Sequence, residues 1–368
     1  TAQFLVEQNK LAGGIVITAS HNPTQWNGLK FIDCDGCFLD SDKNITLFDI
    51  ADSEPSSYNK TGSVQIIENG YLPHITHTLS LSIIDTEAIA KRNFSIVVDA
   101  VNGAASRALP SMVEAFGCTV HRLYCEPDGK FPRGAEPLPH NMADLGEAVR
   151  SHNADAGFAT DPDGDRLAIV DERGNPIGEE YTLTICADGF FKSTSSSSPI
   201  VTNLSTTMAL DKVADKYGST VIRSAVGEIN VVNKMKEVGA VLGGEGNGGV
   251  ILSESHFGRD SLVGAAMFLN RMAQDTWEVS EIFQTMPQFI MVKDKIKLGS
   301  IDPQRMLDKI EAKYTDAISD KTDGLKLSWN NLWVHIRISN TEPIIRIYSE
   351  GETKANAVEL IEGVKQLV

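Results

Sequence analysis

The chain has 368 residues and a formal net charge of -16, and 42% of its residues are hydrophobic and 22% charged. This length suggests about two to four domains, and the composition is ordinary for a globular protein. The acidic balance argues against binding to nucleic acid or to anionic membranes, because both would repel the protein.

The first predicted element is a buried strand at residues 14–18, which leads into the turn Thr18–Pro23 (Thr-Ala-Ser-His-Asn-Pro). A serine at a strand end, on a tight turn with Asn-Pro, is well placed to present its hydroxyl. A hydrolase would need a G-x-S-x-G elbow, which does not surround Ser20. The neighbouring side chain, His21, points away from Ser20 if the chain is extended. Taken alone, Ser20 is also compatible with an ordinary loop serine.

Five cysteines are present, and only Cys34 and Cys37 have metal-like spacing. A structural zinc site needs a second ligand pair, so we favour a hairpin turn at Asp35-Gly36. No secretory signal is visible at the N-terminus, and no apolar stretch approaches the length of a bilayer span. We therefore expect a cytoplasmic protein with reduced thiols.

Two similar strand–helix–Gly–strand units follow, spaced by roughly one domain length. The first runs from a buried strand at 95–99 to Arg122, and the second from a buried strand at 200–203 to Arg223. In each unit a glycine follows the predicted helix as its stop signal. The favoured interpretation is a duplicated domain, and the alternative is that any two such units look alike.

Between the two units, apolar runs flank three carboxylates at alternate positions, Asp161, Asp163 and Asp165, followed by Arg166. Crowding three anions is costly unless a cation neutralises them, and hard oxygen ligands suit magnesium or calcium. An EF-hand loop is excluded, because Arg166 stands where the loop needs Gly and because strands flank the segment. The remaining alternative is a solvated acidic turn.

Two further loops have the composition of ligand-binding loops. Gly243–Gly249 brings backbone close to a ligand and offers Glu245 and Asn247 to hydroxyls; a plain flexible turn is the alternative. Arg337–Pro343, with Arg346 just after it, combines forked donors, hydroxyls and exposed backbone N–H groups into a phosphate clamp. A surface ion-pair cluster is the alternative here.

Polar or Ser-rich segments suggest domain boundaries. They lie at 41–61, near 86–93 and at Ser193–Pro199, which reads as a linker. We expect domains at 1–88 with the Ser20 loop, 89–192 with the aspartate loop, 193–288 with the glycine-rich loop and 289–368 with the arginine loop. The last domain should hold a helix at 303–314, a β-rich stretch at 325–349 and a closing helix near 355–367.

A hydroxyl carrier, a metal loop, a polyol-binding loop and a phosphate clamp together suit phosphoryl transfer on a phosphosugar. In this order the four motifs resemble the α-D-phosphohexomutase superfamily over essentially the whole chain. Gly243–Gly249 with Val226–Asn230 upstream looks most like the archaeal-type phosphoglucosamine mutase branch. The resemblance implies three similar α/β/α domains with mixed sheets and a smaller C-terminal α+β domain around a central cleft.

The resemblance also implies a role for each motif residue. Ser20 would carry the phosphoryl group and, with Asp161, Asp163 and Asp165, bind one Mg²⁺. The implied catalytic residues are Ser20, His21, Lys30 and Arg166. The implied substrate-binding residues are Glu245, Asn247, Arg337, Ser339, Asn340, Thr341 and Arg346. The reaction would interconvert hexose 6- and 1-phosphates through a hexose 1,6-bisphosphate, in a monomer or homodimer.

Two departures from the family pattern stand out. Family members begin well upstream of the serine loop, so we expect the first domain to be N-terminally incomplete. Many bacterial relatives end the sugar loop in His, where this chain has Gly249, so any acid or base role of that His must fall to Lys30, Arg166 or another group.

Glucosamine phosphate is the expected substrate, with mannose and glucose phosphates as alternatives within the superfamily. Two other readings stay open. One is a phosphatase that loses its phosphoryl group to water. The other is a catalytically silent phosphosugar-binding protein.

Overall fold

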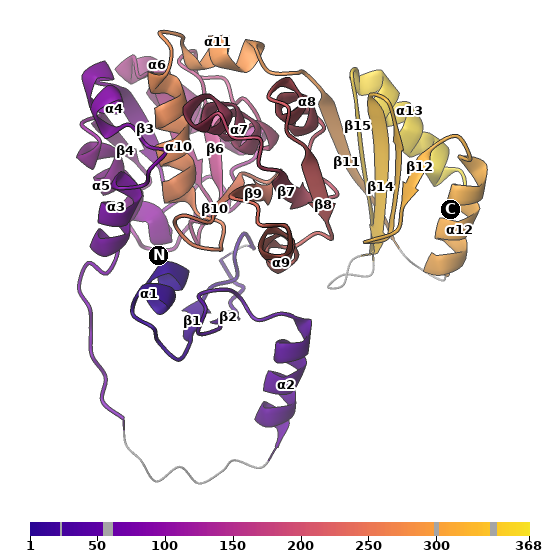
Figure 1. Cartoon of the computed structure of the whole chain (residues 1–368), viewed down its shortest axis with the longest axis horizontal. Helices are drawn as coiled ribbons and strands as arrows, with labels where there is room; N and C mark the ends of the chain where they lie inside the picture. Colours follow the sequence, from indigo (N-terminus) through magenta and orange to yellow (C-terminus); the bar gives the residue numbers. More distant parts are fainter. Residues whose placement is uncertain (23, 54–61, 298–301, 339–343) are drawn as a thin grey trace.

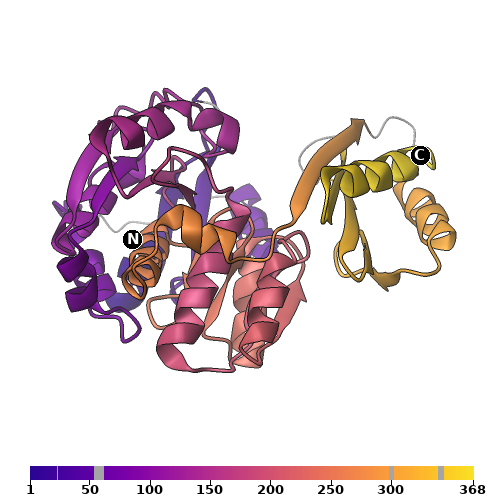
Figure 2. The same cartoon turned by 90° about the horizontal axis from the view of Figure 1, so that it is seen from above.

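A computed structural model describes residues 1–368 except 23, 54–61, 298–301 and 339–343. Its described strands form a two-stranded, two four-stranded and one five-stranded sheet. The five-stranded sheet and its helices stand to one side of the other groups in both views (Figures 1 and 2). The predicted architecture of α/β units followed by a smaller C-terminal α+β domain is confirmed.

The N-terminal group contains a short antiparallel pair. Its elements are α1 (Ala2–Gln8), β1 (Gly14–Ile17), β2 (Leu29–Ile32) and α2 (Ser41–Asp52). The predicted strand at 14–18 is present as β1, but its predicted burial is wrong, because Ile15 and Ile17 are 61% and 71% exposed. Since β1 pairs only with β2 among the described strands, alternate side chains face outward. The predicted turn is confirmed: Gly36 has φ 79° and its N–H donates to Asp33 O at 3.0 Å.

The two four-stranded sheets share one topology. The first runs β4-β3-β5-β6 and the second, read in the same sense, β8-β7-β9-β10. In each, the first three strands are parallel and the last is antiparallel to its neighbour. The strands are β3 (Ser95–Asp99), β4 (Thr119–Leu123), β5 (Ala156–Thr160), β6 (Leu167–Val170), β7 (Ile200–Asn203), β8 (Val221–Ser224), β9 (Leu242–Glu245) and β10 (Gly249–Leu252). The predicted duplication is therefore confirmed.

Helices pack against both sheets. Around the first lie α3 (Leu72–Leu79), α4 (Thr86–Arg92), η1 (Ala104–Ser106), α5 (Ala108–Ala115), η2 (Pro139–Asn141) and α6 (Ala143–His152). Around the second lie α7 (Glu180–Thr194), α8 (Ala209–Lys216), α9 (Glu228–Val238), α10 (Ser261–Ala273) and α11 (Val279–Gln284). Helix α10 contacts α7 and also α3, α4 and α5, so it joins the two units. None of the helices that the structure describes has the length and apolarity needed to span a bilayer.

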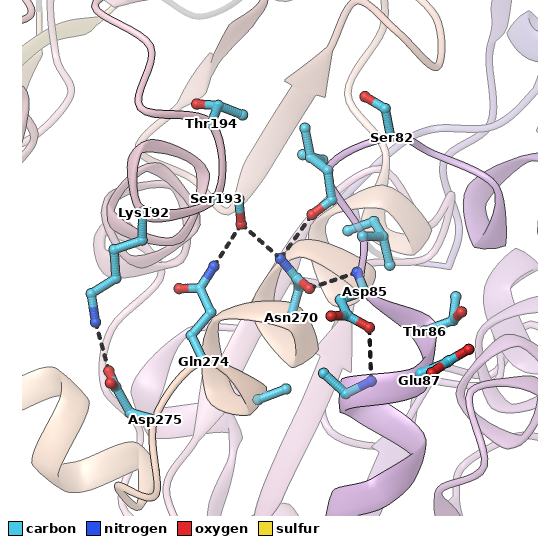
Figure 3. A pocket seen from close by; sticks show the side chains of 14 residues that line it. Ser82, Asp85, Thr86, Glu87, Lys192, Ser193, Thr194, Asn270, Gln274 and Asp275 are labelled. Atoms are coloured by element: carbon cyan, nitrogen blue, oxygen red, sulfur yellow. Dashed lines mark hydrogen bonds and ion pairs between the residues drawn. The ribbon is translucent and has the colours of Figure 1, made fainter.

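The predicted linker at Ser193–Pro199 is partly wrong, because α7 continues through Ser193 and Thr194. Figure 3 shows why this last turn is ordered: the side chains of Asn270 and Gln274 on α10 both donate to Ser193 Oγ, at 3.2 and 2.7 Å. Asn270 also accepts a hydrogen bond from Asp85 N at 2.9 Å. Only Ser195–Pro199 connect α7 to β7.

The C-terminal domain is an antiparallel sheet of order β11-β15-β14-β13-β12 covered by two helices. Its elements are β11 (Ile290–Lys297), α12 (Pro303–Lys313), β12 (Ile318–Asp320), β13 (Leu325–Trp329), β14 (Leu332–Ile338), β15 (Ile344–Gly351) and α13 (Lys354–Lys365). The two predicted helices and the β-rich stretch are confirmed. Their apolar faces form one buried cluster that includes Ile310, Ile347 and Ile361.

Polar contacts connect this domain to the turn after β7. Lys326 Nζ donates to Leu204 O at 2.6 Å, and Glu350 Oε2 accepts from Met208 N at 2.8 Å. His335 Nδ1 lies 2.9 Å from Ser205 Oγ. These contacts fix the edge of the C-terminal sheet next to the second four-stranded sheet.

Candidate functional site

Two equivalent hairpin loops meet at the centre of the site. The loop between β5 and β6 carries the three aspartates, and the loop between β9 and β10 carries Gly246–Gly248. Leu167 N donates to Gly248 O at 2.9 Å. Gly248 has φ 89°, and a Cβ there would lie 2.3 Å from Leu167 O. This contact explains why the loop needs glycine, and it joins the two loops directly.

Each of the three aspartates has one oxygen held by the protein and one without a hydrogen-bond partner. Asp161 Oδ1 accepts the backbone N–H groups of residues 165 and 166, both at 3.1 Å. Asp163 Oδ2 accepts from Lys30 Nζ at 2.7 Å, and Asp165 Oδ2 from Arg259 Nη2 at 2.5 Å. The buried atoms Asp161 Oδ2, Asp163 Oδ1 and Asp165 Oδ1 accept no hydrogen bond, although Arg166 Nε lies 3.5 Å from Asp161 Oδ2 and 3.9 Å from Asp165 Oδ1.

This oxygen cluster fits a divalent cation. The three carboxylates each offer an oxygen within 4.8 Å of the others. Burial, and then the charges of Asp165 and Asp163, raise the pKa of Asp161 well above its usual value. Unpartnered buried oxygens are costly, and a hard cation such as Mg²⁺ would both neutralise the charge and accept their lone pairs.

Ser20 reaches the aspartate loop through a short chain of side chains. Ser20 has φ 53°, and its Oγ lies 3.3 Å from His21 Nδ1. The same His21 nitrogen lies 3.0 Å from Arg166 Nη2, and Arg166 Nη1 donates to Glu136 Oε1 at 3.2 Å. Burial, and then the charge of Arg166, lower the pKa of His21. The αL conformation of Ser20, uncommon for a residue with a Cβ, brings His21 inward rather than away as the sequence suggests.

A cavity of about 400 Å³ lies between the loops and draws its lining from every part of the chain. The lining residues from the sequence prediction are His21, Arg166, Glu245, Asn247, Arg337 and Arg346. Ser20 instead lines an adjoining cavity of about 390 Å³ together with Asn22, Asn102 and Pro162. Lys30 lies beside the aspartates, because its Nζ forms an ion pair with Asp163 Oδ2.

The glycine-rich loop presents a fixed carboxylate and amide. Glu245 Oε1 accepts from Asn203 Nδ2 at 2.7 Å and from Gly227 N at 3.1 Å. Burial would raise the pKa of Glu245, but Arg259 and these donors lower it, so Glu245 is ionised. Asn247 Oδ1 accepts from Gly249 N at 3.1 Å and its Nδ2 donates to Glu245 Oε2 at 3.4 Å, so its amide group is held beside that carboxylate.

The arginine clamp stands at the end of the C-terminal sheet. Arg337 on β14 and Arg346 on β15 are directly opposite one another, and both line the cavity. Arg337 Nε lies 2.7 Å from Asp323 Oδ2. Two cations on facing positions of a strand pair repel, so an anion bound between them would stabilise both. Ser339, Asn340 and Thr341 lie outside the described residues.

Sequence reasoning missed several charged residues of the cavity. They are Glu136, Glu179, Glu180, Glu228, Arg259 and Lys293. Burial raises the pKa of Glu180 to about 8 and that of Glu228 to about 7, although Lys293 and Arg259 oppose these shifts. Apart from Glu228, which lies in the Val226–Asn230 segment, none belongs to a segment singled out in the sequence. The signal that could have found Arg259 is its position in Gly258-Arg259-Asp260, directly before a helix.

Comparison with known families covers nearly the whole chain. Models described as phosphoglucomutase/phosphomannomutase α/β/α domains I, II and III match residues 1–57, 69–174 and 178–289. The model of the C-terminal domain of the same family matches residues 294–366.

Two curated archaeal proteins illustrate the similarity. A phosphoglucomutase/phosphomannomutase of Thermococcus kodakarensis is 34% identical over 362 residues, which are 96% of this chain and 78% of that protein. A probable phosphoglucosamine mutase of Methanopyrus kandleri is 31% identical over 355 residues, covering 95% and 77%.

Two solved structures share the fold. A putative phosphomannomutase from Thermus thermophilus has a TM-score of 0.82 at 22% identity and covers 100% of this chain and 80% of its own. The N-acetylphosphoglucosamine mutase of Aspergillus fumigatus, in complex with GlcNAc-6P and magnesium, has a TM-score of 0.64 at 15% identity and covers 99% and 91%.

Proposed function

The chain belongs to the phosphoglucomutase/phosphomannomutase family and is a phosphohexomutase, and from this premise we propose that it isomerises glucosamine 6- and 1-phosphate through a phosphoserine at Ser20. The observation that carries the site assignment is the set of three unpartnered oxygens on Asp161, Asp163 and Asp165. They lie two side chains away from Ser20, through Arg166 and His21.

In this proposal the aspartates and the Ser20 phosphate hold one Mg²⁺, which when bound would neutralise charge on the transferring phosphoryl group. Lys30 and Arg166 add fixed positive charge beside it. Burial alone would lower the pKa of Lys30, but Asp163 and Asp165 raise it above its usual value. Lys30 therefore stays charged and serves to stabilise charge rather than to accept a proton.

The reaction needs a base for the sugar hydroxyl. His21 lines the cavity and is neutral at neutral pH because its pKa is lowered, so we assign it that role. The hydroxyl oxygen attacks phosphorus, the bond from phosphorus to Ser20 Oγ breaks, and the hydroxyl proton passes to His21. His21 Nδ1, 3.3 Å from Ser20 Oγ, then gives that proton to the departing Ser20 oxygen, which becomes a neutral hydroxyl. The resulting bisphosphate turns over, and the reverse transfer of its other phosphoryl group restores phosphoserine.

The remaining groups would hold the sugar through both orientations. Glu245 and Asn247 face hydroxyls, and Arg337 and Arg346 hold the phosphate that is not transferred, because forked guanidinium groups suit phosphate oxygens. Ser339, Asn340 and Thr341 belong to this proposal by family pattern alone. The three similar units and the C-terminal domain are proposed to follow the boundaries 1–88, 89–192, 193–288 and 289–368.

One observation supports an amino sugar: curated archaeal relatives at about 30% identity carry the name probable phosphoglucosamine mutase. The second candidate is activity on glucose or mannose phosphate, which the name of the Thermococcus relative favours.

Coupled assays with glucosamine, glucose and mannose 1-phosphates, in Mg²⁺ with a hexose 1,6-bisphosphate, test the proposal. We expect the highest kcat/KM with glucosamine phosphate. Turnover of glucose or mannose phosphate alone would select the second candidate. Ser20→Ala should lower turnover by at least about 10³-fold, as loss of a covalent nucleophile does, while phosphosugar binding persists. Full activity in Ser20→Ala would remove Ser20 from the mechanism.

A further inference from the structure

Arg259 contacts three carboxylates of the site, although it belongs to no motif recognised in the sequence. It lies in the turn before α10, and its side chain is only 9% exposed. Its three guanidinium nitrogens have three different carboxylate partners. Nη2 donates to Asp165 Oδ2 at 2.5 Å, Nη1 to Glu245 Oε2 at 2.5 Å and Nε to Glu228 Oε2 at 3.1 Å. A planar fork can satisfy three separated acceptors in this way, and a single ammonium cannot.

The side chain of Arg259 also fills the space next to Gly249. A Cβ at Gly249 would lie 2.2 Å from Arg259 Cδ, and the backbone there is not in the left-handed region. The position therefore needs glycine for space rather than for conformation. Position 249 ends the glycine-rich loop, so the Cγ and Cδ methylenes of Arg259 occupy the space that a side chain at this position would need.

The backbone at Arg259 is held firmly by its neighbours. Asp260 accepts the N–H groups of residues 262 and 263 at 2.8 and 3.2 Å, so it caps α10. Its other oxygen lies 2.8 Å from His256 Nε2. Ser261 Oγ donates to Gly164 O in the aspartate loop at 2.7 Å. Ordering the long side chain on this fixed backbone still costs rotamer freedom, which its three charged contacts offset.

We propose that Arg259 is a positioning residue that couples the aspartate loop to the glycine-rich loop, and that Gly249 is glycine to make room for it. By holding Asp165 Oδ2, Arg259 leaves Oδ1 as the unpartnered oxygen of the cluster. By holding Glu245 Oε2, it fixes the carboxylate that faces the sugar. The proposal rests on the proposed Mg²⁺ site, and its test is separable from turnover.

The first measurement is titration calorimetry with Mg²⁺ alone on the full chain. Arg259→Ala should weaken Mg²⁺ binding by about ten-fold or more, as the loss of a group that orients a metal ligand does. Arg259→Lys should restore only part of this loss, because one ammonium cannot hold three carboxylates. In the coupled assay, Arg259→Ala should lower kcat and raise KM together, since both loops lose their support.

Arg271 supplies a matched control, because it is also a buried arginine with carboxylate partners, Asp188 and Asp275, but lies outside the cavity. Arg271→Ala should destabilise the fold and leave Mg²⁺ affinity within about two-fold of wild type, a difference of roughly 0.4 kcal/mol. Equal losses of Mg²⁺ affinity in both arginine variants would show a general effect of buried charge and overturn the proposal.

A double-mutant cycle tests the pairing with Gly249. Gly249→Ala keeps the guanidinium but displaces it, so it should weaken Mg²⁺ binding in the wild-type background and have little effect in the Arg259→Ala background. Gly189 is the control, since a Cβ there would lie 2.9 Å from Arg271 Cβ. Gly189→Ala should leave Mg²⁺ affinity unchanged. Additive effects of the 249 and 259 substitutions would overturn the pairing.

The outcomes separate this inference from the proposed function. A wild-type chain that does not bind Mg²⁺ contradicts the metal site itself. A wild-type chain that binds Mg²⁺ with the same affinity as Arg259→Ala contradicts only the positioning role. If Arg259→Ala does not fold, Gly249→Ala and Arg259→Lys carry the same comparison, and unchanged Mg²⁺ affinity in both would end the proposal.

Discussion

Lys30 Nζ lies 2.7 Å from Asp163 Oδ2, although 133 residues separate the two along the chain. Lys30 belongs to β2 in the N-terminal pair and Asp163 to the loop after β5. The contact is partly buried, with side-chain exposures of 27% and 7%. This ion pair therefore joins the N-terminal group to the aspartate loop.

Lys30→Met should reduce kcat by about 10² to 10³, the usual cost of removing a fixed charge that stabilises a transition state. Mg²⁺ affinity should rise or stay level, because Asp163 loses a competing cation. Steady-state kinetics and Mg²⁺ titration together check this. Lys43→Met is the matched control, since Lys43 forms an ion pair with Asp33 in the same N-terminal part of the structure but its side chain is 54% exposed. A kcat in Lys30→Met equal to that control would remove Lys30 from the site.

Asp163→Asn should weaken Mg²⁺ binding by about ten-fold or more, because one of three charges on the cluster is lost and a charge-assisted contact is worth about 1.5–3 kcal/mol. Phosphorylation of Ser20, which adds roughly -1.5 to -2 charges, should tighten Mg²⁺ binding instead. Calorimetry of the two phosphorylation states and of Asp163→Asn checks both directions. Asp128→Asn, in an exposed turn with Lys130, should leave affinity unchanged.

Much of this site could be predicted because its motifs are local. Three carboxylates between two apolar runs predict a strand–loop–strand metal site, and β5 and β6 do flank the aspartates. The sequence could not show that this loop and the glycine-rich loop occupy the same place in two copies of one topology. That equivalence appears only when the orders β4-β3-β5-β6 and β8-β7-β9-β10 are compared.

The missed residues are those whose partners are distant in the chain. Arg259 contacts Asp165 across 94 residues, and no periodicity encodes such a pairing. The strand at 14–18 was misjudged for the opposite reason. An apolar run shows that a strand exists but not what covers its faces, and Ile15 and Ile17 are exposed because β1 pairs with β2 alone among the described strands.

Arg337→Gln should raise KM for the phosphosugar by about ten-fold or more with a smaller change in kcat, because it removes a charge-assisted contact to a phosphate that is not transferred. It also frees Asp323, which Arg337 pairs with at 2.7 Å. Arg223→Gln is a suitable control, since Arg223 pairs with Asp211 nearby but does not line the cavity. A change confined to kcat in Arg337→Gln would place Arg337 with the transferring phosphate instead.

The stability of the C-terminal domain should fall in acid because of His335. Burial lowers the pKa of His335 to about 4, although a hydrogen bond to Asp323 O opposes this shift. Its Nε2 lies 2.7 Å from that carbonyl oxygen and so carries the proton, which leaves Nδ1 to accept from Ser205 Oγ. A second proton would place a buried cation beside Lys326, whose pKa burial already lowers well below its usual value.

Because the folded pKa is below the unfolded value of about 6.5, the contribution of His335 is complete above pH 6.5 and is lost as pH falls toward 4. The slope should approach 1.4 kcal/mol per pH unit in that window. Urea unfolding between pH 7 and 4.5, followed by the fluorescence of Trp329 and Trp333, measures it. His335→Gln keeps a donor and an acceptor but cannot titrate, so its slope should be smaller. Equal slopes in the two proteins would assign the acid sensitivity to other groups.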